Sequence, residues 1–538
     1  MPVLAAFGVI DWGVLLAYMA LVASIGTIVS RRRDDAEGYF LAGRSMPAWA
    51  VALSIIATSL SVATFIGVPQ EAFTGDLTYL SQSIGTFLAV IVVATVFVPR
   101  LYRAGTITIY GYIQQRYGQP ASIAMSVMFL LGRLLASGAR LFMAAIPVSL
   151  LLWGFDARSA DLAGIPRWQL VASIVLIGGI GVAYTLAGGV RAVIWTDTAQ
   201  ITIVAGAAAV SIYMLLDRIP VSAGEICSAL SAAGPHGASK LRILDTSFSA
   251  TGKFTLWTAL IGATFLNTAA YGTDHDLAQR MLTARSPLRG SLSLIASQII
   301  GTLVVAMFLV LGLLLYVFYQ RPDIMGQAAP SDRVVWSYGV YPQFLLNHMP
   351  AGLAGLAMAG MFAAAQGSLD SAINAMAGSA VADIYWPLRR RRGLPPDSST
   401  RAPRIAVILM GAALIIFAVG AALVYDARMQ TLIAFALGIM SFAYSGMLGV
   451  FLAALLTHRG STRSVMAALF VGMFVTALLQ DGIMRIWTLH LTGRPHTLAF
   501  YWWLPIGTAC SFVVCIAGRS PRAGAVHNAP APAGTDSR

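Results

Sequence analysis

The chain has 538 residues, of which 58% are hydrophobic and only 11% are charged. Soluble domains are about 45–50% apolar and about 25% charged, so this composition excludes a soluble multidomain protein. Apolar stretches of roughly 18 to 30 residues recur along the whole chain, and each is long enough to cross a hydrocarbon core of about 30 Å. The net charge of +13 comes from basic residues in short loops beside apolar stretches, which is typical of membrane topology rather than of nucleic-acid binding. The sequence therefore predicts an all-α polytopic membrane protein.

The apolar periodicity predicts thirteen transmembrane helices. They cover residues 9–30, 47–70, 78–99, 120–153, 168–187, 192–216, 254–272, 290–318, 351–384, 403–425, 429–456, 464–480 and 499–517.

The distribution of basic residues predicts the orientation of these spans. With the N-terminus outside, the cytoplasmic segments hold 22 Lys and Arg residues and the outer segments hold 11. In this assignment Arg280 belongs to a cytoplasmic loop. We therefore expect a multi-pass protein of an inner or plasma membrane, with the N-terminus outside and a disordered cytoplasmic tail over 519–538. The familiar motifs of soluble enzymes are missing, so we expect no catalytic activity.

Polar residues gather in the middle of the second span, between Ala57 and Thr64. Small and hydroxyl residues there permit either close packing of helices or local unwinding. An unwound segment presents backbone carbonyl oxygens, which are suitable ligands for an alkali cation. Both interpretations fit this stretch taken alone.

The ninth span carries a stripe of small and polar residues at helical spacing, Ala364, Gly367, Ser368 and Ser371. Asp370 flanks this stripe, and a carboxylate so deep in a span is costly. It indicates either coupling to a cation or proton, or a buried ion pair with an arginine of the fourth span.

Three more charged residues lie within the spans. Asp197, near the start of the sixth span, either lines an ion exit path or favours the helix dipole. Arg133 and Arg140 are seven residues apart in the fourth span and share one helix face. Each either binds a substrate carboxylate, pairs permanently with Asp370 or Asp197, or extends toward the membrane interface.

The seventh span contains Asn267 at its middle and ends near Gly272, where a helix can break. His275 follows, and we expect it in a loop or at a helix end. Two interrupted helices five spans apart are typical of two five-helix repeats whose first helices meet at the membrane midplane.

Four motifs identify a family resemblance: FLAGRSMPAW (40–49), GGVRAVIWTDTAQ (188–200), GTDHDLAQRMLTARS (272–286) and GSLDSAINAMAGSAVADIY (367–385). Together they resemble the sodium:solute symporter family, over about residues 9–517. The resemblance implies a leucine-transporter-like core of two inverted five-helix repeats. It divides the chain into an N-terminal helix and basic loop (1–46), a first repeat (47–216), an extracellular loop (217–253), a second repeat (254–456), two C-terminal helices (457–518) and the tail (519–538).

The resemblance also implies a sodium site. Its ligands map onto Ala57, Leu60, Ala364, Gly367 and Ser368. Gly367 departs from the pattern, because members of the family usually carry a hydroxyl there, so water, Ser371 or Asp370 would have to replace it. The resemblance places a second cation, or its exit path, at Asp197, Asp370 and Ser371. The number of sodium ions is therefore one or two, and protons are an alternative.

Substrate contacts implied by the resemblance, together with the two arginines, map onto Ser59, Ser61, Thr64, Gln82, Ser83, Thr86, Arg133, Arg140 and Asn267. Leu437 and Gly301 stand where sugar-transporting members carry a glutamine and a lysine, so a galactose-type site is not expected. We expect a sodium-coupled symporter that imports a small organic anion or sugar acid by alternating access. The alternatives are a proton-coupled symporter using Asp370 and a transporter of a neutral sugar, amino acid or vitamin. The expected partners are the solute, sodium and the lipid bilayer, without nucleic acid.

Overall fold

The computed structural model describes residues 7–29, 36–153, 165–231, 238–330, 339–395, 399–424 and 432–519. The predicted tail from residue 520 onward, the basic run Arg31–Arg33 and the side chain of Leu437 lie outside the described part. Within that part the chain is helical, and the only pairing of β type is an isolated bridge between Met46 and Ala284.

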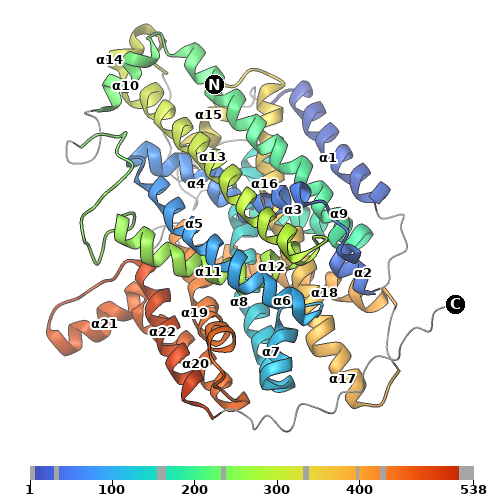
Figure 1. Ribbon diagram of the computed structural model, residues 1–538. Helices are drawn as coiled ribbons and strands as arrows, with labels where there is room; N and C mark the ends of the chain where they lie inside the picture. The colour runs from blue at the N-terminus through green and yellow to red at the C-terminus, as the bar shows by residue number, and fades with distance from the viewer. Residues whose placement is uncertain are drawn as a thin grey trace.

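Most of the helices follow one another with short connections, whereas a longer irregular segment that includes residues 238–255 lies between α10 and α11 (Figure 1). They are α1 (Val9–Val29), α2 (Ala36–Leu41), α3 (Ala48–Ser59), α4 (Val62–Thr74), α5 (Gln82–Val92), α6 (Val98–Ala104), α7 (Tyr110–Tyr117), α8 (Gln119–Trp153), α9 (Arg167–Arg218), α10 (Ala223–Ser231), α11 (Thr264–Gly272), α12 (His275–Leu282), α13 (Pro287–Gln320), α14 (Pro322–Met325), α15 (Val340–His348), α16 (Leu353–Ser379), α17 (Trp386–Arg391), α18 (Arg401–Val424), α19 (Leu432–Leu456), α20 (Thr462–Leu479), α21 (Asp481–Thr492) and α22 (Phe500–Ala517).

A helix lies at the position of every predicted span. The predicted fifth and sixth spans are continuous in α9, which bends at Gly189, where φ is 56° and ψ is −161°. A side chain there would strain the backbone, and its Cβ would lie 2.5 Å from the carbonyl oxygen of Tyr39. By length and apolarity, eight helices of the described residues can span a membrane, or nine when one bent pair counts as a span. The number thirteen and the two inverted repeats stay predictions.

The bent pair is the predicted second span. Helix α3 ends at Ser59, α4 begins at Val62, and the two axes differ by 67°. Leu60 and Ser61 between them are extended, and Ser61 caps α4 in a reciprocal arrangement with Thr64. The predicted unwinding is therefore confirmed. The predicted break at Gly272 is also confirmed, because α11 ends there and α12 begins at His275.

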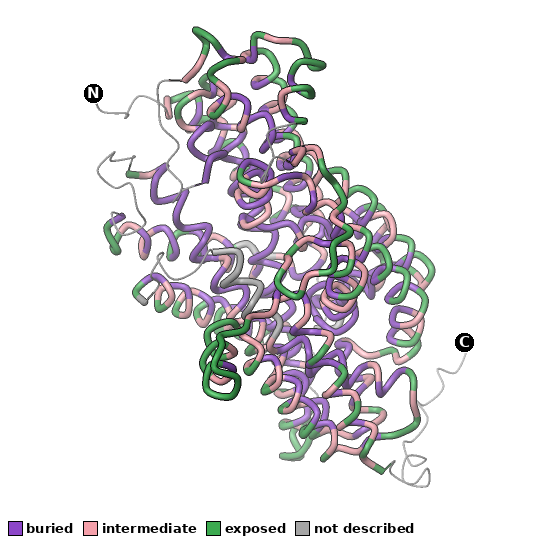
Figure 2. Tube along the Cα trace, turned by 90° about the vertical axis from the view of Figure 1, so that its left-hand side faces the viewer, coloured by how far each residue is buried: buried purple, intermediate pink, exposed green. Residues whose placement is uncertain are grey.

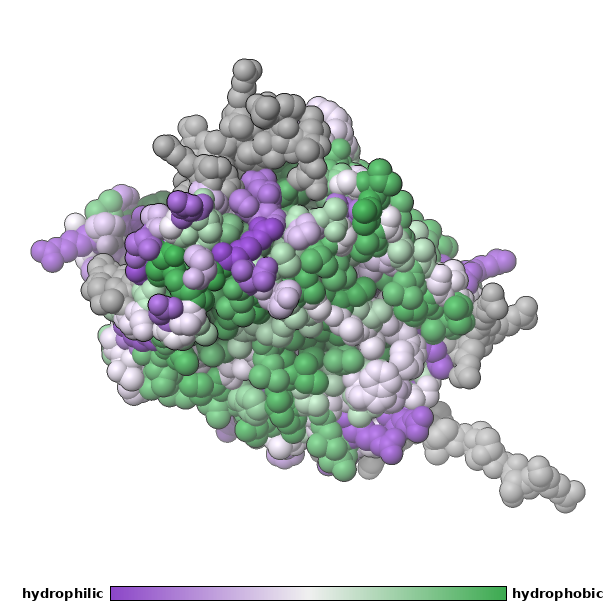
Figure 3. Space-filling model, turned by 90° about the horizontal axis from the view of Figure 1, so that it is seen from above, coloured by the Kyte–Doolittle hydropathy of each residue, from purple (hydrophilic) through white to green (hydrophobic). Residues whose placement is uncertain are grey.

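The core helices α3, α9 and α16 lie against one another, and the buried residues run through the middle of the molecule (Figure 2). Helix α1 packs on α9 and α16, whereas α20 and α22 pack on α19 at the opposite flank (Figure 1). Large apolar side chains such as Leu303, Ile416 and Phe470 are exposed, and Figure 3 shows broad apolar areas on the face seen from above. A surface of this kind suits a lipid environment.

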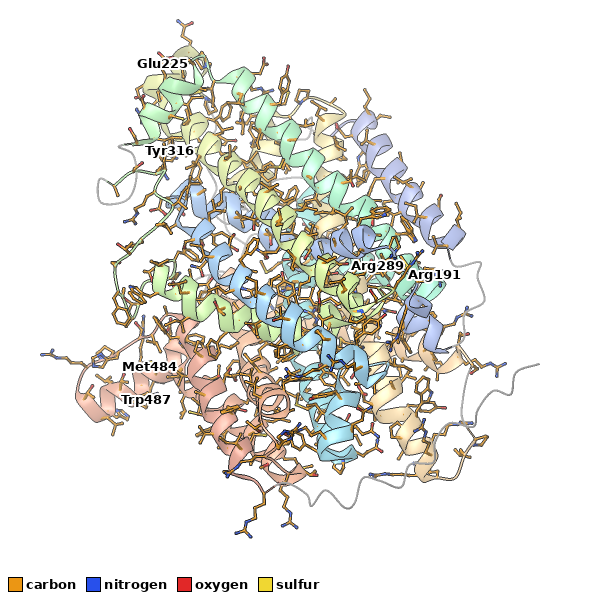
Figure 4. All side chains as sticks on the ribbon, viewed as in Figure 1. Arg191, Glu225, Arg289, Tyr316, Met484 and Trp487 are labelled. Atoms are coloured by element: carbon orange, nitrogen blue, oxygen red, sulfur yellow. The ribbon has the colours of Figure 1, made fainter. Side chains whose placement is uncertain are left out.

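A buried lysine ties the segment after α10 to the end of α4. The Nζ atom of Lys240 donates hydrogen bonds to the carbonyl oxygens of Ala72, Phe73 and Gly75 at 3.1, 2.8 and 2.6 Å. It also lies 4.1 Å from the ring centroid of Tyr316, which Figure 4 labels on α13. Carbonyl groups at a helix C-terminus have no partner within their helix, so a cation there is stabilising.

Candidate functional site

A cavity of about 280 Å³ lies beside the break between α3 and α4. Its lining includes every predicted substrate residue except Ser83, namely Ser59, Ser61, Thr64, Gln82, Thr86, Arg133, Arg140 and Asn267. The break brings these groups together. Ser59 ends α3, Ser61 stands in the unwound turn and Thr64 lies in the first turn of α4, while α5, α8 and α11 supply the other residues.

Polar groups on facing helices contact each other across this cavity. The amide Nδ2 of Asn267 donates a hydrogen bond of 3.0 Å to Thr86 Oγ1, so α11 and α5 present a linked pair of polar side chains. Thr58 also lines the cavity, and its hydroxyl lies 2.9 Å from that of Ser371 on α16. The cavity thus borders the polar stripe of the ninth span.

The two arginines of α8 differ in their surroundings. Arg133 is buried, contacts a carboxylate oxygen of Asp276 and lies 3.5 Å from one of Asp274. The hydroxyl of Tyr444 donates a short hydrogen bond to Asp274. The predicted alternative in which Arg133 pairs with Asp370 or Asp197 is therefore wrong, because the break at Gly272 brings the acids of α12 beneath it. Arg140 lines the cavity and is half-buried.

Two residues of the predicted sodium site, Ala57 and Gly367, lie against each other beside the break. The carbonyl oxygen of Ala57 lies 3.2 Å from the position that a Cβ atom on Gly367 would occupy. Leu60 stands in the unwound turn, where carbonyl groups lose their helical partners. The hydroxyl of Ser368 donates to the carbonyl oxygens of Ala365 and Ala364, at 3.2 and 3.5 Å. The oxygen-only donor set fits an alkali cation.

A glutamine that sequence reasoning did not select faces the gap left by Gly367. The Oε1 atom of Gln200 lies 2.9 Å from the same Cβ position, so its amide occupies the space of a missing side chain. Gln200 is buried, and neither polar atom of its amide has a hydrogen-bond partner in the described part of the protein. A usable signal exists in the sequence, since Gln200 follows Asp197 by three residues and shares its helix face.

Asp197 belongs to a sealed charged cluster. Its Oδ2 atom accepts a hydrogen bond of 2.5 Å from Ser54 and lies 3.5 Å from a guanidinium nitrogen of Arg280. Arg280 also contacts the hydroxyl of Ser371. Arg280, which the charge count placed in a cytoplasmic segment, does not lie in an exposed loop: it is fully buried on α12, because that short helix turns inward after the break.

The N-terminal helix reaches this same region. Tyr18 of α1 is buried, and it lies close enough to Gln200, Asp370 and Asp197 for these side chains to interact with it electrostatically. Seven residues earlier, the carboxylate of Asp11 accepts hydrogen bonds from the backbone N–H groups of Gly352 and Gly355, at 2.7 and 2.8 Å. Asp11 thereby binds α1 to the first turn of α16.

A sequence model of the sodium:solute symporter family matches residues 39–472. The chain belongs to this family. Family members matched over most of their length include the sodium/sialic acid symporter SiaT of Proteus mirabilis, with 26% identity over 88% of this chain and 90% of that one. The human sodium/iodide cotransporter is 26% identical over 93% of this chain and 70% of its own. The mouse sodium-coupled monocarboxylate transporter 1 is 26% identical over 89% and 74%. This symporter is therefore a membrane transporter and not an enzyme.

Solved structures share its fold. A sodium-coupled sialic acid symporter in a substrate-bound, outward-open state superposes with a TM-score of 0.77 and 24% identity, covering 95% of this chain and 98% of that one. A nucleobase-cation-symport-1 family transporter follows at a TM-score of 0.56 and 14% identity, covering 89% and 92%. At these identities the likeness concerns the fold alone.

Proposed function

We propose that this symporter uses a sodium gradient to import a small organic anion by alternating access, with Arg140 as the contact for the substrate carboxylate. The observation that carries this proposal is the lining of the cavity, in which the guanidinium of Arg140 stands among hydroxyl and amide groups. Arg133 also lines the cavity, contacts Asp276 and lies 3.5 Å from Asp274. A guanidinium group binds a carboxylate through paired hydrogen bonds.

The rest of the lining favours a hydroxylated anion such as a sugar acid. Ser59, Ser61, Thr64 and Gln82 offer both donors and acceptors to hydroxyl groups. Two relatives supply independent support, since one is described as a sialic acid symporter and another as a monocarboxylate transporter.

The sodium ligands in this proposal are the carbonyl oxygens of Ala57, Leu60 and Ala364 with the hydroxyl of Ser368. Gln200 takes the role that a hydroxyl at residue 367 has elsewhere in the family, because its amide oxygen faces that position. One charge that crosses 100 mV contributes about 2.3 kcal/mol, and a tenfold sodium gradient adds about 1.4 kcal/mol. Together they support roughly 500-fold accumulation per ion.

A second cation is assigned to Asp370 rather than to the space between Asp197 and Ser371. Arg280 contacts both of the latter residues, so a positive charge already lies there. The second candidate function is proton coupling through Asp370, which the loss of a hydroxyl at Gly367 favours. The predicted orientation, with the N-terminus outside, belongs to the same proposal.

The deciding experiment measures the thermal stability of the purified protein in sodium and in potassium. A cation that binds only the folded protein raises its melting temperature by mass action. We expect stabilisation by sodium that is lost in Ser368→Ala and retained in Ser24→Ala, whose hydroxyl is exposed on α1. Indifference to sodium, with stabilisation by acid that Asp370→Asn abolishes, would replace sodium by protons.

A transport experiment tests the substrate class. Proteoliposomes with an imposed sodium gradient are expected to accumulate N-acetylneuraminic acid or a short monocarboxylate, and Arg140→Gln should abolish both. Uptake of neutral solutes but of neither acid would disprove the assignment of an organic anion.

A further inference from the structure

The cavity extends well beyond the residues that the proposed function uses. Ser61, Thr64, Val68 and Glu71 recur at helical spacing on one face of α4, and all of them line it. Glu71 lies seven residues beyond Thr64, which is about 10 Å along the helix axis. Lys253 lines the same end and is exposed, so the cavity opens to the surface there.

Two opposite charges stand at this open end. Glu71 is half-buried, and its carboxylate interacts electrostatically with the positive charge of Lys253. Among the described residues, no side chain is within hydrogen-bonding or ion-pairing distance of the Glu71 carboxylate. A carboxylate held in a cavity wall without a fixed partner has acceptor capacity for a ligand.

Aromatic rings from three separate segments surround these charges. Tyr79 and Phe254 meet edge to face with centroids 5.2 Å apart, and Phe254 lies 6.2 Å from Tyr501. Tyr501 in turn lies 4.1 Å from Phe500. All four residues line the cavity, so its open end is apolar and aromatic apart from Glu71 and Lys253.

We propose that the open end is a second substrate subsite, which binds the hydroxylated end of an acidic sugar while the carboxylate of the same molecule lies at Arg140. Glu71 accepts hydrogen bonds from neighbouring hydroxyl groups, and the apolar C–H face of the sugar lies against the aromatic rings. This inference rests on the proposed function, since it requires the carboxylate to be at Arg140. It goes further by making Glu71 the residue that selects polyhydroxylated acids over short ones.

The charges at the open end favour this ligand over an amine. A bound ammonium group would meet the positive charge of Lys253 beside Glu71, whereas hydroxyl groups interact favourably with both residues. A short monocarboxylate held beside the break, where Thr64 lies, would not extend the 10 Å or so along α4 to Glu71. The two kinds of acid therefore differ in their dependence on the open end.

The experiment compares two acids in sodium-driven uptake into proteoliposomes, N-acetylneuraminic acid and propionic acid. In Glu71→Leu we expect the apparent KM for N-acetylneuraminic acid to rise at least tenfold, because hydrogen bonds to a charged acceptor are lost. The KM for propionic acid should change by less than about twofold. Glu71→Gln keeps the shape and one acceptor, so it should be intermediate. Asp323→Asn, which removes an exposed charge elsewhere, is the matched control.

The outcomes separate this inference from the proposed function. Equal effects of Glu71→Leu on both acids, or no effect on either, would disprove the subsite while sodium-coupled anion uptake stands. Uptake of propionic acid alone by the native protein would also overturn it. Failure of the native protein to take up either acid would remove the proposed function and the subsite with it. Retention of sodium stabilisation in each variant shows that the variant is folded.

Discussion

Two polar regions lie on opposite sides of Thr58, and they differ in how their charges are balanced. On one side Asp197, Arg280 and Ser371 form a cluster that is fully buried and held by direct contacts. On the other side Arg140 lines an open cavity among hydroxyl and amide groups. Thr58 contacts Ser371 and lines the cavity, so it belongs to both regions. The same residue types thus occur in a fully buried cluster on one side of Thr58 and in the wall of a cavity on the other.

The largest expected effect comes from breaking the sealed cluster. Arg280→Met leaves the carboxylate of Asp197 buried without its cation, which costs about 3–5 kcal/mol of stability. Thermal unfolding of the purified variant measures this loss. Arg289→Met, which removes an exposed arginine near the start of α13 (Figure 4), should leave the melting temperature unchanged. The double variant Arg280→Gln with Asp197→Asn should recover most of the loss, and no recovery would show that the pair is not the cause.

The next largest effects are expected for substitutions of the two arginines of α8. These substitutions compare an arginine held by two carboxylates with one that lines the cavity. Arg140→Gln should lower the kcat/KM for organic anions about a hundredfold or more, because it removes the proposed contact for the substrate carboxylate. Arg133→Gln should lower the melting temperature, because it removes the cation that Asp274 and Asp276 share and leaves Arg280, 3.5 Å from Asp276, to balance them. The reverse pattern would exchange the roles assigned to these residues.

A smaller effect is expected where Gln200 faces Gly367. Gln200→Ala should weaken sodium binding about tenfold, as the loss of one hydrogen-bonding or ion-binding oxygen does. Gly367→Ser alone places its Cβ 2.9 Å from Gln200 Oε1 and should also weaken binding. The double variant, Gln200→Ala with Gly367→Ser, has the serine hydroxyl and lacks the amide that obstructs it. It should therefore bind sodium more tightly than either single variant. Sodium titrations followed by melting temperature test this, and a double variant weaker than either single one would contradict it.

The smallest expected effect concerns Lys240, outside both regions. Burial lowers the pKa of Lys240 to about 8, whereas an unfolded lysine titrates near 10.5. Between these values the folded protein binds fewer protons than the unfolded chain, so this group makes the protein more stable as the pH rises from about 8 to 10.5.

Melting temperatures at pH values across this range should therefore show a rise for the native protein that Lys240→Met lacks. Lys253→Met, at an exposed lysine, should keep that rise. If the melting temperatures of all three proteins changed with pH in the same way, the lowered pKa of Lys240 would be disproved.

Much of this architecture was predictable from the sequence. Helix positions follow from apolar stretches. The small and hydroxyl residues at the centre of the second span permit the break after Ser59, but close packing of helices fits them as well. The partners of the buried charges were not predictable. Arg280 follows a polar stretch that is typical of a loop, and only the inward turn of α12 places it against Asp197. The spacing of Gln200 from Asp197 is a signal in the sequence, but its approach to Gly367 follows only from the packing of α9 beside α16.

The contact between Asp11 and α16 has a consequence for the order of assembly. Helix α1 is the first to leave the ribosome, yet the backbone groups that Asp11 binds lie 341 and 344 residues later in the chain. Until Gly352 and Gly355 are synthesised and inserted, this carboxylate must keep its water or another temporary partner. The earliest helix therefore reaches its final position late, because α1 can dock through Asp11 only after α16 is in place.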